Sequence, residues 1–188
     1  YIGLPRGCQN EATELLTSLG IKVDIIDERN PGRPIDYIFQ GELRPEQQTA
    51  AASLLEHDIG VLSAATAFGK TVVAGYLISK RAVNTLIVVH RQQLLEQWVS
   101  RLSAFLNINP NDIGRIGAGK HKPTGIIDIA LMQSLVKNNT VDELVQDYGY
   151  LIVDECHYIS ANSFEQVARQ CKARYVTGLS ATVLRIDG

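Results

Sequence analysis

Residues 64–71 read AATAFGKT, and they stand between an apolar run, IGVLS, and a segment of helical pattern, TVVAGYLIS. The last three residues, Gly-Lys-Thr at 69–71, match the end of the phosphate-binding pattern G-x-x-x-x-G-K-[ST], but Ala64 replaces its first glycine. In a strand-loop-helix unit, backbone N–H groups at the helix N-terminus bind phosphate oxygens. The stretch therefore predicts a nucleotide-binding loop, and the alternative is an ordinary Gly-Lys turn before a helix.

Short apolar runs recur along the rest of the chain, and turn residues bound each of them. We expect buried strands at IGVL, TLIVV, IIDIAL, YLIVDE and YVTGLSA. Between these runs, apolar residues recur every three or four positions, as they do on one face of a helix. The alternation of strand and helix predicts an α/β domain with a mostly parallel sheet flanked by helices on both faces.

Three of the predicted helices have identifiable features. One follows VVH and carries the apolar stripe Leu95, Val99, Leu102 and Leu106. The other two are predicted to begin at capping boxes, in which a Ser or Thr is followed three residues later by Glu or Gln. These boxes are Thr140 with Glu143 and Ser163 with Gln166.

Residues 1–40 differ in pattern from the rest of the chain. A helical stripe ends at Gly20, IKVDIID alternates like a strand, and the turn-rich ERNPGRP follows. We predict a small accessory strand-helix-strand element at 1–40, as part of a truncated N-terminal domain, and a main domain at 41–188. The chain begins with Tyr1 rather than Met and stops without a closing helix, so we expect it to be a piece of a longer protein.

Composition limits the class of protein. The chain has 188 residues, of which 45% are hydrophobic and 20% charged, which fits one globular domain with a small appendage. Its longest apolar runs are far shorter than the roughly 20 residues of a membrane helix. A net charge of -2 means that any contact with nucleic acid must be local. Three widely spaced cysteines indicate neither a disulfide framework nor a zinc site, and a reducing cytoplasm fits best.

A second motif lies in the run YLIVDECH, which ends an expected strand with Asp154 and Glu155. Ligands of open α/β sheets bind at this carboxyl edge. Asp154, together with Thr71, could hold Mg²⁺, while Glu155 could orient and deprotonate an attacking water and Lys70 could contact the β and γ phosphates. The alternative is a pair of solvated carboxylates, but the presence of the loop at 64–71 in the same chain makes it the weaker reading.

Taken together, these motifs resemble those of the superfamily 2 helicases of the DEAD/DEAH-box type. DECH at 154–157 resembles their DEAH-type box, LSAT at 179–182 their third motif, and LRPEQQTAA at 43–51 their adenine-reading segment. VVHRQQLLEQW, DIALMQSL and ATVLRIDG resemble further segments, in the order of the family. The resemblance begins near residue 41 and is nearest the branch with the excision-repair helicase and the helicase-like subunits of restriction systems. It implies a RecA-like P-loop NTPase domain, the first of two motor domains.

The resemblance implies a role for individual positions in binding ATP and Mg²⁺. Gln47 would contact the adenine edge with help from Arg44, although an isolated Gln could simply be solvated. The phosphates would be wrapped by Thr66, Ala67, Phe68, Gly69, Lys70 and Thr71. His157 would link this site to Ser180 and Thr182, which would couple hydrolysis to movement; without the family, His157 would be read as a packed histidine.

Nucleic acid, DNA rather than RNA, is the partner that the resemblance implies. The candidate contacts are His90, Arg91, Gln92, Gly117, Gln133 and Ser134. Helix N-termini and short polar side chains contact the backbone of a strand without reading its sequence. The basic stretch GKHK at 119–122 could add phosphate attraction or could be a solvated turn. Trp98 lies on an apolar helical face, which favours core packing over base stacking.

The loop departs from the family at Ala67, where glycine is usual, whereas Ala64 stands at a position that is ordinarily alanine. A left-handed conformation at Ala67 would cost on the order of 1 kcal/mol. If the residue keeps right-handed angles, its methyl group only narrows the loop.

We therefore expect the ATP-binding motor domain of an ATP-dependent DNA helicase or translocase. The second RecA-like domain is absent and would supply an arginine finger worth roughly 10³ to 10⁵ in rate, so the isolated fragment is expected to be nearly inactive. Arg185 matches the exit from the domain rather than a finger. The alternative is a non-hydrolysing nucleic-acid-binding or scaffold module with a retained P-loop fold. A P-loop kinase is disfavoured, because nothing in the sequence supplies a lid that binds the phosphate acceptor.

Overall fold

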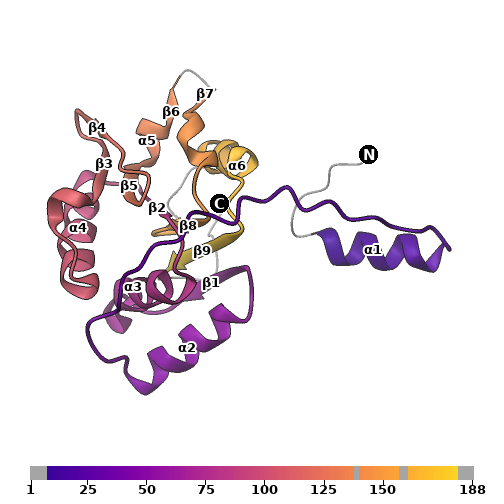
Figure 1. Cartoon of the computed structure of the whole chain (residues 1–188), viewed down its shortest axis with the longest axis horizontal. Helices are drawn as coiled ribbons and strands as arrows, with labels where there is room; N and C mark the ends of the chain where they lie inside the picture. The colour runs from indigo at the N-terminus through magenta and orange to yellow at the C-terminus, as the bar shows by residue number, and fades with distance from the viewer. Residues whose placement is uncertain (1–7, 138–139, 157–160, 182–188) are drawn as a thin grey trace, which may run out of the picture.

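The computed structural model describes residues 8–137, 140–156 and 161–181. Within these ranges, the centre of the molecule is a seven-stranded sheet with the order β1-β9-β8-β2-β5-β3-β4 (Figure 1). All strands run parallel except β4, which pairs antiparallel with β3 at the edge. The strands are β1 (Ile59–Ser63), β2 (Thr85–Val89), β3 (Gly114–Gly117), β4 (Lys120–Lys122), β5 (Ile127–Leu131), β8 (Tyr150–Val153) and β9 (Tyr175–Ser180). The predicted mostly parallel sheet is confirmed, and a strand forms at each of the five predicted runs. The prediction that IGVL is a buried strand is wrong, because β1 lies at the edge of the sheet with Ile59 and Val61 exposed.

Helices cover both faces of the sheet. One face packs against α2 (Pro45–Leu55), α3 (Lys70–Arg81) and α4 (Gln92–Leu106), and the other against α5 (Met132–Leu135), the 3-10 turn η4 (Glu143–Gln146) and α6 (Ala161–Gln170). The central strands contribute to both cores because successive side chains point to opposite faces. In β2, Ile87 and Val89 join the first core while Leu86 and Val88 join the second. The near-continuous apolar runs of the sequence follow from this two-sided burial.

The stripe predicted for the helix after VVH is confirmed. Leu95, Val99, Leu102 and Leu106 are all buried on the inner face of α4. The helix ends at Asn107, which adopts a left-handed conformation with φ of 51°. No helix in the described ranges is long and apolar enough to cross a membrane.

Both predicted capping boxes are wrong about where a helix begins. Thr140 lies in the short strand β7 (Thr140–Val141), which pairs with β6 (Val136–Lys137). The turn that follows is capped by the Asp142 side chain, which accepts a hydrogen bond from Leu144 N at 3.2 Å, and it is the 3-10 turn η4 rather than an α-helix. Ser163 lies inside α6, which begins two residues earlier at Ala161. The S/T-x-x-E/Q spacing is met inside helices and turns as well as at their ends, so tertiary contacts decided these boundaries.

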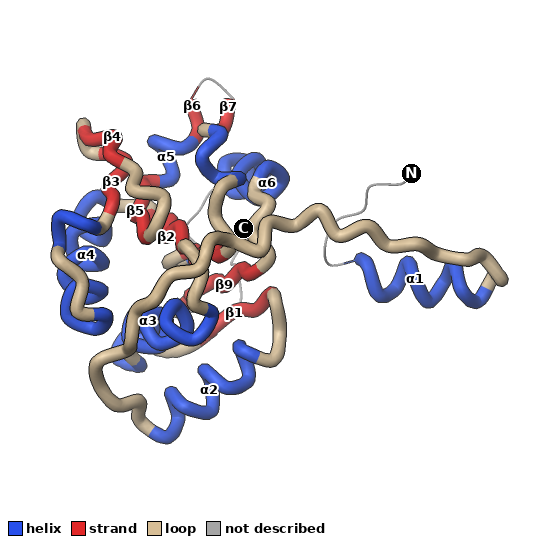
Figure 2. Tube along the Cα trace, in the orientation of Figure 1, coloured by secondary structure: helices blue, strands red, loops and turns tan. Residues whose placement is uncertain are grey.

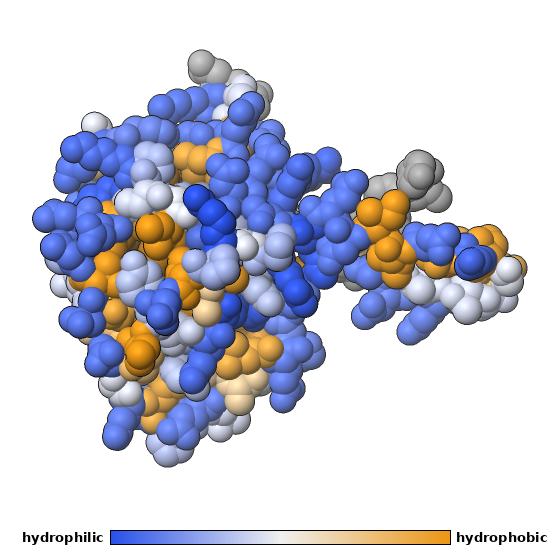
Figure 3. All heavy atoms as spheres, viewed as in Figure 1, coloured by the Kyte–Doolittle hydropathy of each residue, from blue (hydrophilic) through white to orange (hydrophobic). Residues whose placement is uncertain are grey.

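The N-terminal part forms an arm that projects from the domain (Figure 1). It contains the predicted helix, α1 (Gln9–Ser18), and Gly20 follows with a φ of 73°. The strand expected at IKVDIID is not formed: this segment is an extended loop without a partner strand in the described chain (Figure 2). Isolated extended backbone has no ladder of hydrogen bonds, so alternation alone does not make a strand. The arm carries exposed apolar side chains, among them Leu19 (66% exposed) and Ile26 (66%). Figure 3 shows apolar residues on the surface of the arm.

A buried asparagine, Asn84, attaches the segment that follows the arm to the sheet. Asn84 Oδ1 accepts hydrogen bonds from the backbone N–H of Arg33 at 2.8 Å and of Gly149 at 3.1 Å, while Nδ2 donates to Asp147 O at 2.9 Å. A bridge between Asn30 and Ala173 adds a second attachment. The segment after the arm is therefore fixed to the amino-terminal edge of the sheet, which leaves the carboxyl edge uncovered by it.

Candidate nucleotide and nucleic-acid site

The order of the strands divides the carboxyl edge of the sheet into two halves. The loop at 64–71 follows β1, Ser180 ends β9, and Asp154 follows β8, and these three strands are neighbours. His90 follows β2, Gln133 follows β5 and Gly117 ends β3, and these three strands are neighbours too. The predicted nucleotide residues and the predicted nucleic-acid residues therefore form two adjoining groups along one edge.

The loop leads directly into the N-terminus of a helix. It forms the 3-10 turn η2 (Thr66–Phe68), and Gly69 is left-handed with a φ of 85° immediately before α3 begins at Lys70. The first N–H groups of a helix have no acceptor within the helix, which makes them available to an anion. Ala67 lies inside η2 and is not among the residues with positive φ, so its methyl group causes no backbone strain.

Two side chains of the adenine-reading segment hold this loop from outside. Gln47 Nε2 and Arg44 Nη2 donate to the carbonyl oxygen of Phe68 at 2.7 Å and 2.6 Å. Gln47 Oε1 also accepts from the backbone N–H of Arg44 at 2.9 Å. Gln47 is 4% exposed, and because an amide nitrogen has two hydrogens and an amide oxygen two lone pairs, each atom keeps one further bonding position. The structure thus connects the predicted adenine site directly to the phosphate loop.

Lys70 and Asp154 lie close together on this edge. Lys70 is 7% exposed, and its Nζ donates to the carbonyl of Ala64 at 2.9 Å. Burial raises the pKa of Asp154 and the charge of Glu155 adds to this, while a hydrogen bond from Trp98 and the charge of Lys70 oppose it. A lysine, a hydroxyl at Thr71 and a buried carboxylate are the donor set that a nucleoside triphosphate with Mg²⁺ requires. The residues present therefore fit ATP and Mg²⁺.

Glu155 adopts a left-handed conformation with a φ of 49°, which is unusual for a residue with a Cβ. Such strained residues cluster at functional sites, where the surrounding structure holds them in place. Cys156 follows, and burial raises the pKa of its thiol while a hydrogen bond with Ser180 opposes this. The end of β8 is therefore in contact with the third motif.

Ser180 also contacts the phosphate loop. It is 2% exposed, and its carbonyl accepts from the backbone N–H of Ala64 at 3.0 Å. This bond continues the pairing of β1 with β9, in which Ser63 lies opposite Ser180. Two residues predicted to take part in coupling, His157 and Thr182, lie outside the described residues.

The predicted nucleic-acid residues are brought together at the ends of β2, β5 and β3. Gln133 Nε2 donates to His90 O at 3.3 Å, which joins the two segments. Arg91 and Gln92 begin α4 and are exposed, and they line a shallow depression with Gln93 and Glu96. Ser134 is half-buried in α5. Gly117 is buried with a φ of 128°, so it shapes the edge but exposes little surface.

The basic stretch 119–122 forms part of a hairpin. Lys120, His121 and Lys122 make up β4, and all three are exposed. Lys120 Nζ and Arg115 Nε lie 3.9 Å and 3.7 Å from the carboxylate of Glu96 on α4. The hairpin therefore adds exposed positive charge next to the start of α4, although part of that charge is balanced by Glu96.

Sequence reasoning missed two side chains at this site, both on α4. Trp98 is buried in the core, as predicted, but its Nε1 donates to Asp154 Oδ2 at 2.7 Å. Arg101 Nη1 donates to the Thr71 hydroxyl at 3.0 Å. The only available signal was their spacing of one helical turn, and the sequence does not show which strand end that face of the helix meets.

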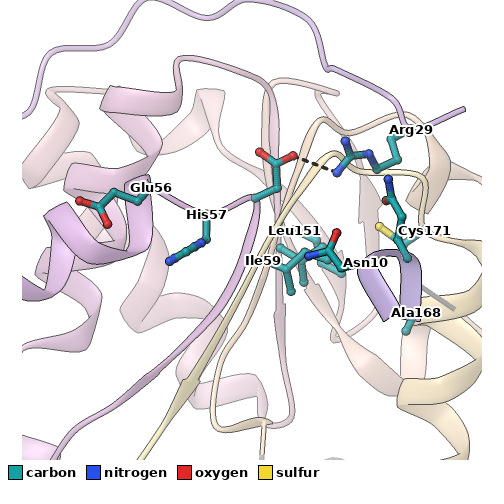
Figure 4. Close-up of a pocket in the computed structure, with 11 residues that line it drawn as sticks. Asn10, Arg29, Glu56, His57, Ile59, Leu151, Ala168 and Cys171 are labelled. Carbon is teal, nitrogen blue, oxygen red and sulfur yellow. Dashed lines mark hydrogen bonds and ion pairs between the residues drawn. The ribbon is translucent and has the colours of Figure 1, made fainter. Parts of the chain in front are cut away.

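A second cavity lies at the opposite edge of the sheet (Figure 4). It has a volume of about 730 Å³, and its lining includes Ile59, Leu151 and Val176, which lie at or next to the starts of β1, β8 and β9. Arg29 and Asp58 form an ion pair of 2.9 Å across its rim. Because it lies at the amino ends of the strands, this cavity is separate from the phosphate loop.

The fold and the ordered motifs define the class: this is the ATPase domain of a superfamily 2 helicase or translocase. The chain belongs to the ResIII family, described as type III restriction enzyme, res subunit, whose sequence profile matches residues 40–185.

Two similar proteins are named as an RNA helicase and as a DNA translocase. The chain is 33% identical over 193 residues to a putative ATP-dependent RNA helicase, L396, of Acanthamoeba polyphaga mimivirus, covering 100% of this chain and 36% of the relative. It is 33% identical over 147 residues to the DNA 3'-5' translocase XPB2 of Sulfurisphaera tokodaii, covering 78% and 32%. The chain thus spans about a third of the length of these relatives.

Solved structures with the same fold include two motor proteins. The UvsW helicase of bacteriophage T4 has a TM-score of 0.72 at 18% identity, over 96% of this chain and 72% of that one. The SWI2/SNF2 ATPase core of Sulfolobus solfataricus, solved with double-stranded DNA, has a TM-score of 0.62 at 19% identity, over 81% and 34%. At these identities the likeness shows the shared fold.

Proposed function

We propose that this chain is the ATP-binding motor domain of a DNA helicase or translocase that couples ATP hydrolysis to movement along nucleic acid. The observation that carries the proposal is that Lys70 and Thr71, after β1, and Asp154, after β8, lie at one edge of the sheet beside the predicted nucleic-acid residues. A nucleotide site and a strand-binding surface on one sheet edge can be mechanically connected.

Each residue of the nucleotide site has a role in this proposal. The N–H groups at the start of α3 and the Lys70 ammonium bind the phosphates, and Gln47 contacts the adenine edge. Thr71 and Asp154 would hold Mg²⁺, which neutralises charge on the phosphates when bound. Glu155 accepts a proton from the attacking water.

Movement would be coupled to this chemistry through the third motif. The carbonyl of Ser180 accepts from Ala64 at the start of the phosphate loop, and Ser180 also contacts Cys156 after β8. A change in the loop is therefore transmitted to β9 by direct hydrogen bonds. We include His157 and Thr182 in this path on the resemblance alone.

DNA is the proposed partner because a relative is named a DNA translocase and a neighbour of the same fold was solved on double-stranded DNA. The exposed start of α4 and the hairpin at 120–122 support local phosphate contacts. Hydrolysis would need an arginine finger from a second motor domain, so the chain alone should turn over ATP negligibly.

The proposal is tested by isothermal titration calorimetry of the 188-residue chain with a non-hydrolysable ATP analogue and MgCl₂. Wild-type protein should bind, Lys70→Ala should lose at least about tenfold in affinity, and Glu155→Gln should bind like wild type because Glu155 acts on water rather than on the nucleotide. Absence of binding by the wild-type chain would overturn the proposal. Titration with single-stranded DNA, duplex DNA and RNA of one sequence then tests the choice of partner.

The alternative function, a non-hydrolysing binding or scaffold module, had one sequence feature in its favour, Ala67. The right-handed turn at Ala67 removes that argument, since the loop keeps its conformation without glycine there. Steady turnover by a longer chain with both motor domains would decide against the alternative.

A further inference from the structure

Trp98 is the single tryptophan of the chain, and it connects α4 to the end of β8. It is 2% exposed, and its indole N–H donates to Asp154 Oδ2 at 2.7 Å. Strand β2, which precedes α4, lies next to β8 in the sheet, so the helix passes directly beside the Asp154 carboxylate. The bond therefore links two segments that are 56 residues apart in the chain.

This bond does more than satisfy a buried donor. A buried indole N–H needs an acceptor, but here the acceptor is the carboxylate that the proposed function assigns to Mg²⁺. A carboxylate with one oxygen held by a rigid ring can present its other oxygen in only a narrow range of directions. Partners of this kind orient metal ligands, and their removal typically costs 10-fold to 100-fold in metal affinity or activity.

A second contact from the same face of α4 reaches the other residue predicted to hold the metal. Arg101 follows Trp98 by three residues, a spacing that places both side chains on one side of a helix. Its Nη1 donates to Thr71 Oγ1 at 3.0 Å. One helix therefore contacts both residues predicted to hold the metal, Thr71 through Arg101 and Asp154 through Trp98.

The same helix begins at the predicted nucleic-acid surface. Arg91 is its N-cap residue and Gln92 its first residue, and both are exposed. Trp98 lies about two turns further along, because a helix has about 3.6 residues per turn. A displacement of α4 by a bound strand would therefore move the donor that holds Asp154.

We propose that Trp98 is a positioning residue for Asp154, fixing the carboxylate for Mg²⁺ and connecting the nucleic-acid end of α4 to the metal site. The inference rests on the proposed function, since it presumes that Asp154 binds the metal. Trp98 touches neither nucleotide nor water in this role; it acts through Asp154.

The first test measures how much Mg²⁺ strengthens nucleotide binding. The affinity of the 188-residue chain for a non-hydrolysable ATP analogue is determined by calorimetry in MgCl₂ and again in EDTA, and the ratio is the enhancement by Mg²⁺. Trp98→Phe keeps an aromatic ring but lacks the N–H, so the enhancement should fall about tenfold or more while the affinity in EDTA stays unchanged. A wild-type enhancement in Trp98→Phe would overturn the inference.

The matched control is Tyr148→Phe. Tyr148 is also a buried aromatic residue whose polar atom donates to an aspartate, Asp128, but it lies in the second core on the other face of the sheet. This variant should lose stability and keep the wild-type enhancement. Equal loss of enhancement in both variants would show a general effect of weakened packing and would overturn the specific role of Trp98.

The second test needs no change at Trp98. With excitation selective for tryptophan, emission from the wild-type chain reports this one residue. Addition of MgCl₂ to the chain with the ATP analogue should shift the emission. The analogue in EDTA should cause no shift. In Asp154→Asn, MgCl₂ and the analogue together should cause no shift. If the wild-type chain binds the analogue but its emission does not change with Mg²⁺, the inference is overturned and the proposed function stands. If the wild-type chain does not bind the analogue, the proposed function is overturned as well.

Discussion

The guanidinium of Arg101 donates to the hydroxyl of Thr71 at 3.0 Å, so a fixed positive charge stands beside a predicted Mg²⁺ ligand. A guanidinium and Mg²⁺ are both positively charged, so they repel each other when they share a ligand, even at the high effective dielectric of a protein surface. A cation here should strengthen the binding of a nucleotide without Mg²⁺ and weaken the binding of Mg²⁺.

Arg101→Ala should therefore weaken binding of an ATP analogue in EDTA and strengthen the enhancement by Mg²⁺, each by a few-fold. Calorimetry in EDTA and in MgCl₂ measures both quantities. Arg101→Lys keeps the charge and should behave like wild type. If the alanine and lysine variants gave the same values, charge would not be the reason for the effect.

Two small residues of the phosphate loop, Gly69 and Ala67, should respond differently to substitution. Gly69 has a φ of 85°, and a Cβ there would meet Gln47 Nε2 at 2.7 Å. Gly69→Ala should therefore destabilise the chain by at least about 1 kcal/mol and weaken nucleotide binding about tenfold or more. Thermal unfolding and calorimetry provide the two measurements.

Ala67→Gly is the matched control for Gly69→Ala, because Ala67 already has right-handed angles inside η2. Its nucleotide affinity should stay within about twofold of wild type, since glycine adds freedom that this turn does not need. A large gain in affinity on Ala67→Gly would show that the methyl group obstructs the loop.

Asn84 should be important for stability rather than for nucleotide binding. It is completely buried, and its amide forms hydrogen bonds with backbone groups of Arg33, Gly149 and Asp147 at the amino edge of the sheet. Asn84→Ala leaves buried backbone groups without partners, at about 1–3 kcal/mol each, so we expect a loss of about 3 kcal/mol in the free energy of unfolding. Urea titration followed by circular dichroism measures this loss.

The control for Asn84 is Asn10→Ala, since Asn10 is exposed on α1. Its free energy of unfolding should change by less than about 0.5 kcal/mol. Similar losses in the two variants would contradict the role given to Asn84.

Stability should fall at alkaline pH, in part through Tyr148. Burial raises the pKa of Tyr148, and the charge of Asp128 and a hydrogen bond to it raise this pKa further; burial also raises the pKa of Tyr150. A group with a raised pKa in the folded state stabilises the protein below its unfolded pKa of about 10, and this contribution is lost as the pH rises above that value.

Each such tyrosine should contribute about 1.4 kcal/mol per pH unit to the decline above about pH 10. Tyr148→Phe cannot ionise, so the slope of its unfolding free energy against pH should be shallower than that of wild type by this amount. Urea unfolding of wild type and Tyr148→Phe at several values between pH 9 and pH 11 measures the two slopes of unfolding free energy against pH. Parallel slopes would show that Tyr148 is not protected from ionisation by the fold.

Much of the fold could be predicted from local patterns. The central strands β2 and β8 are buried on both sides, so their apolar runs are unbroken, and the stripe of α4 lies on one helical face. The capping boxes and the alternating IKVDIID were misleading because they are short local patterns. Whether Thr140 caps a helix or pairs in β7, and whether 21–27 finds a partner strand, depends on neighbours from elsewhere in the chain.

The sequence by itself determined the class of fold and the main chemical groups of the proposed nucleotide site, because the phosphate loop and the pair Asp154 and Glu155 are each contiguous in the sequence. Only the tertiary structure decided which strands are neighbours, and therefore that the β1, β9 and β8 ends form one half of the edge and the β2, β5 and β3 ends the other. It also decided that Trp98 and Arg101 contact Asp154 and Thr71. These contacts arise from the packing of α4 across the sheet, which no local pattern encodes.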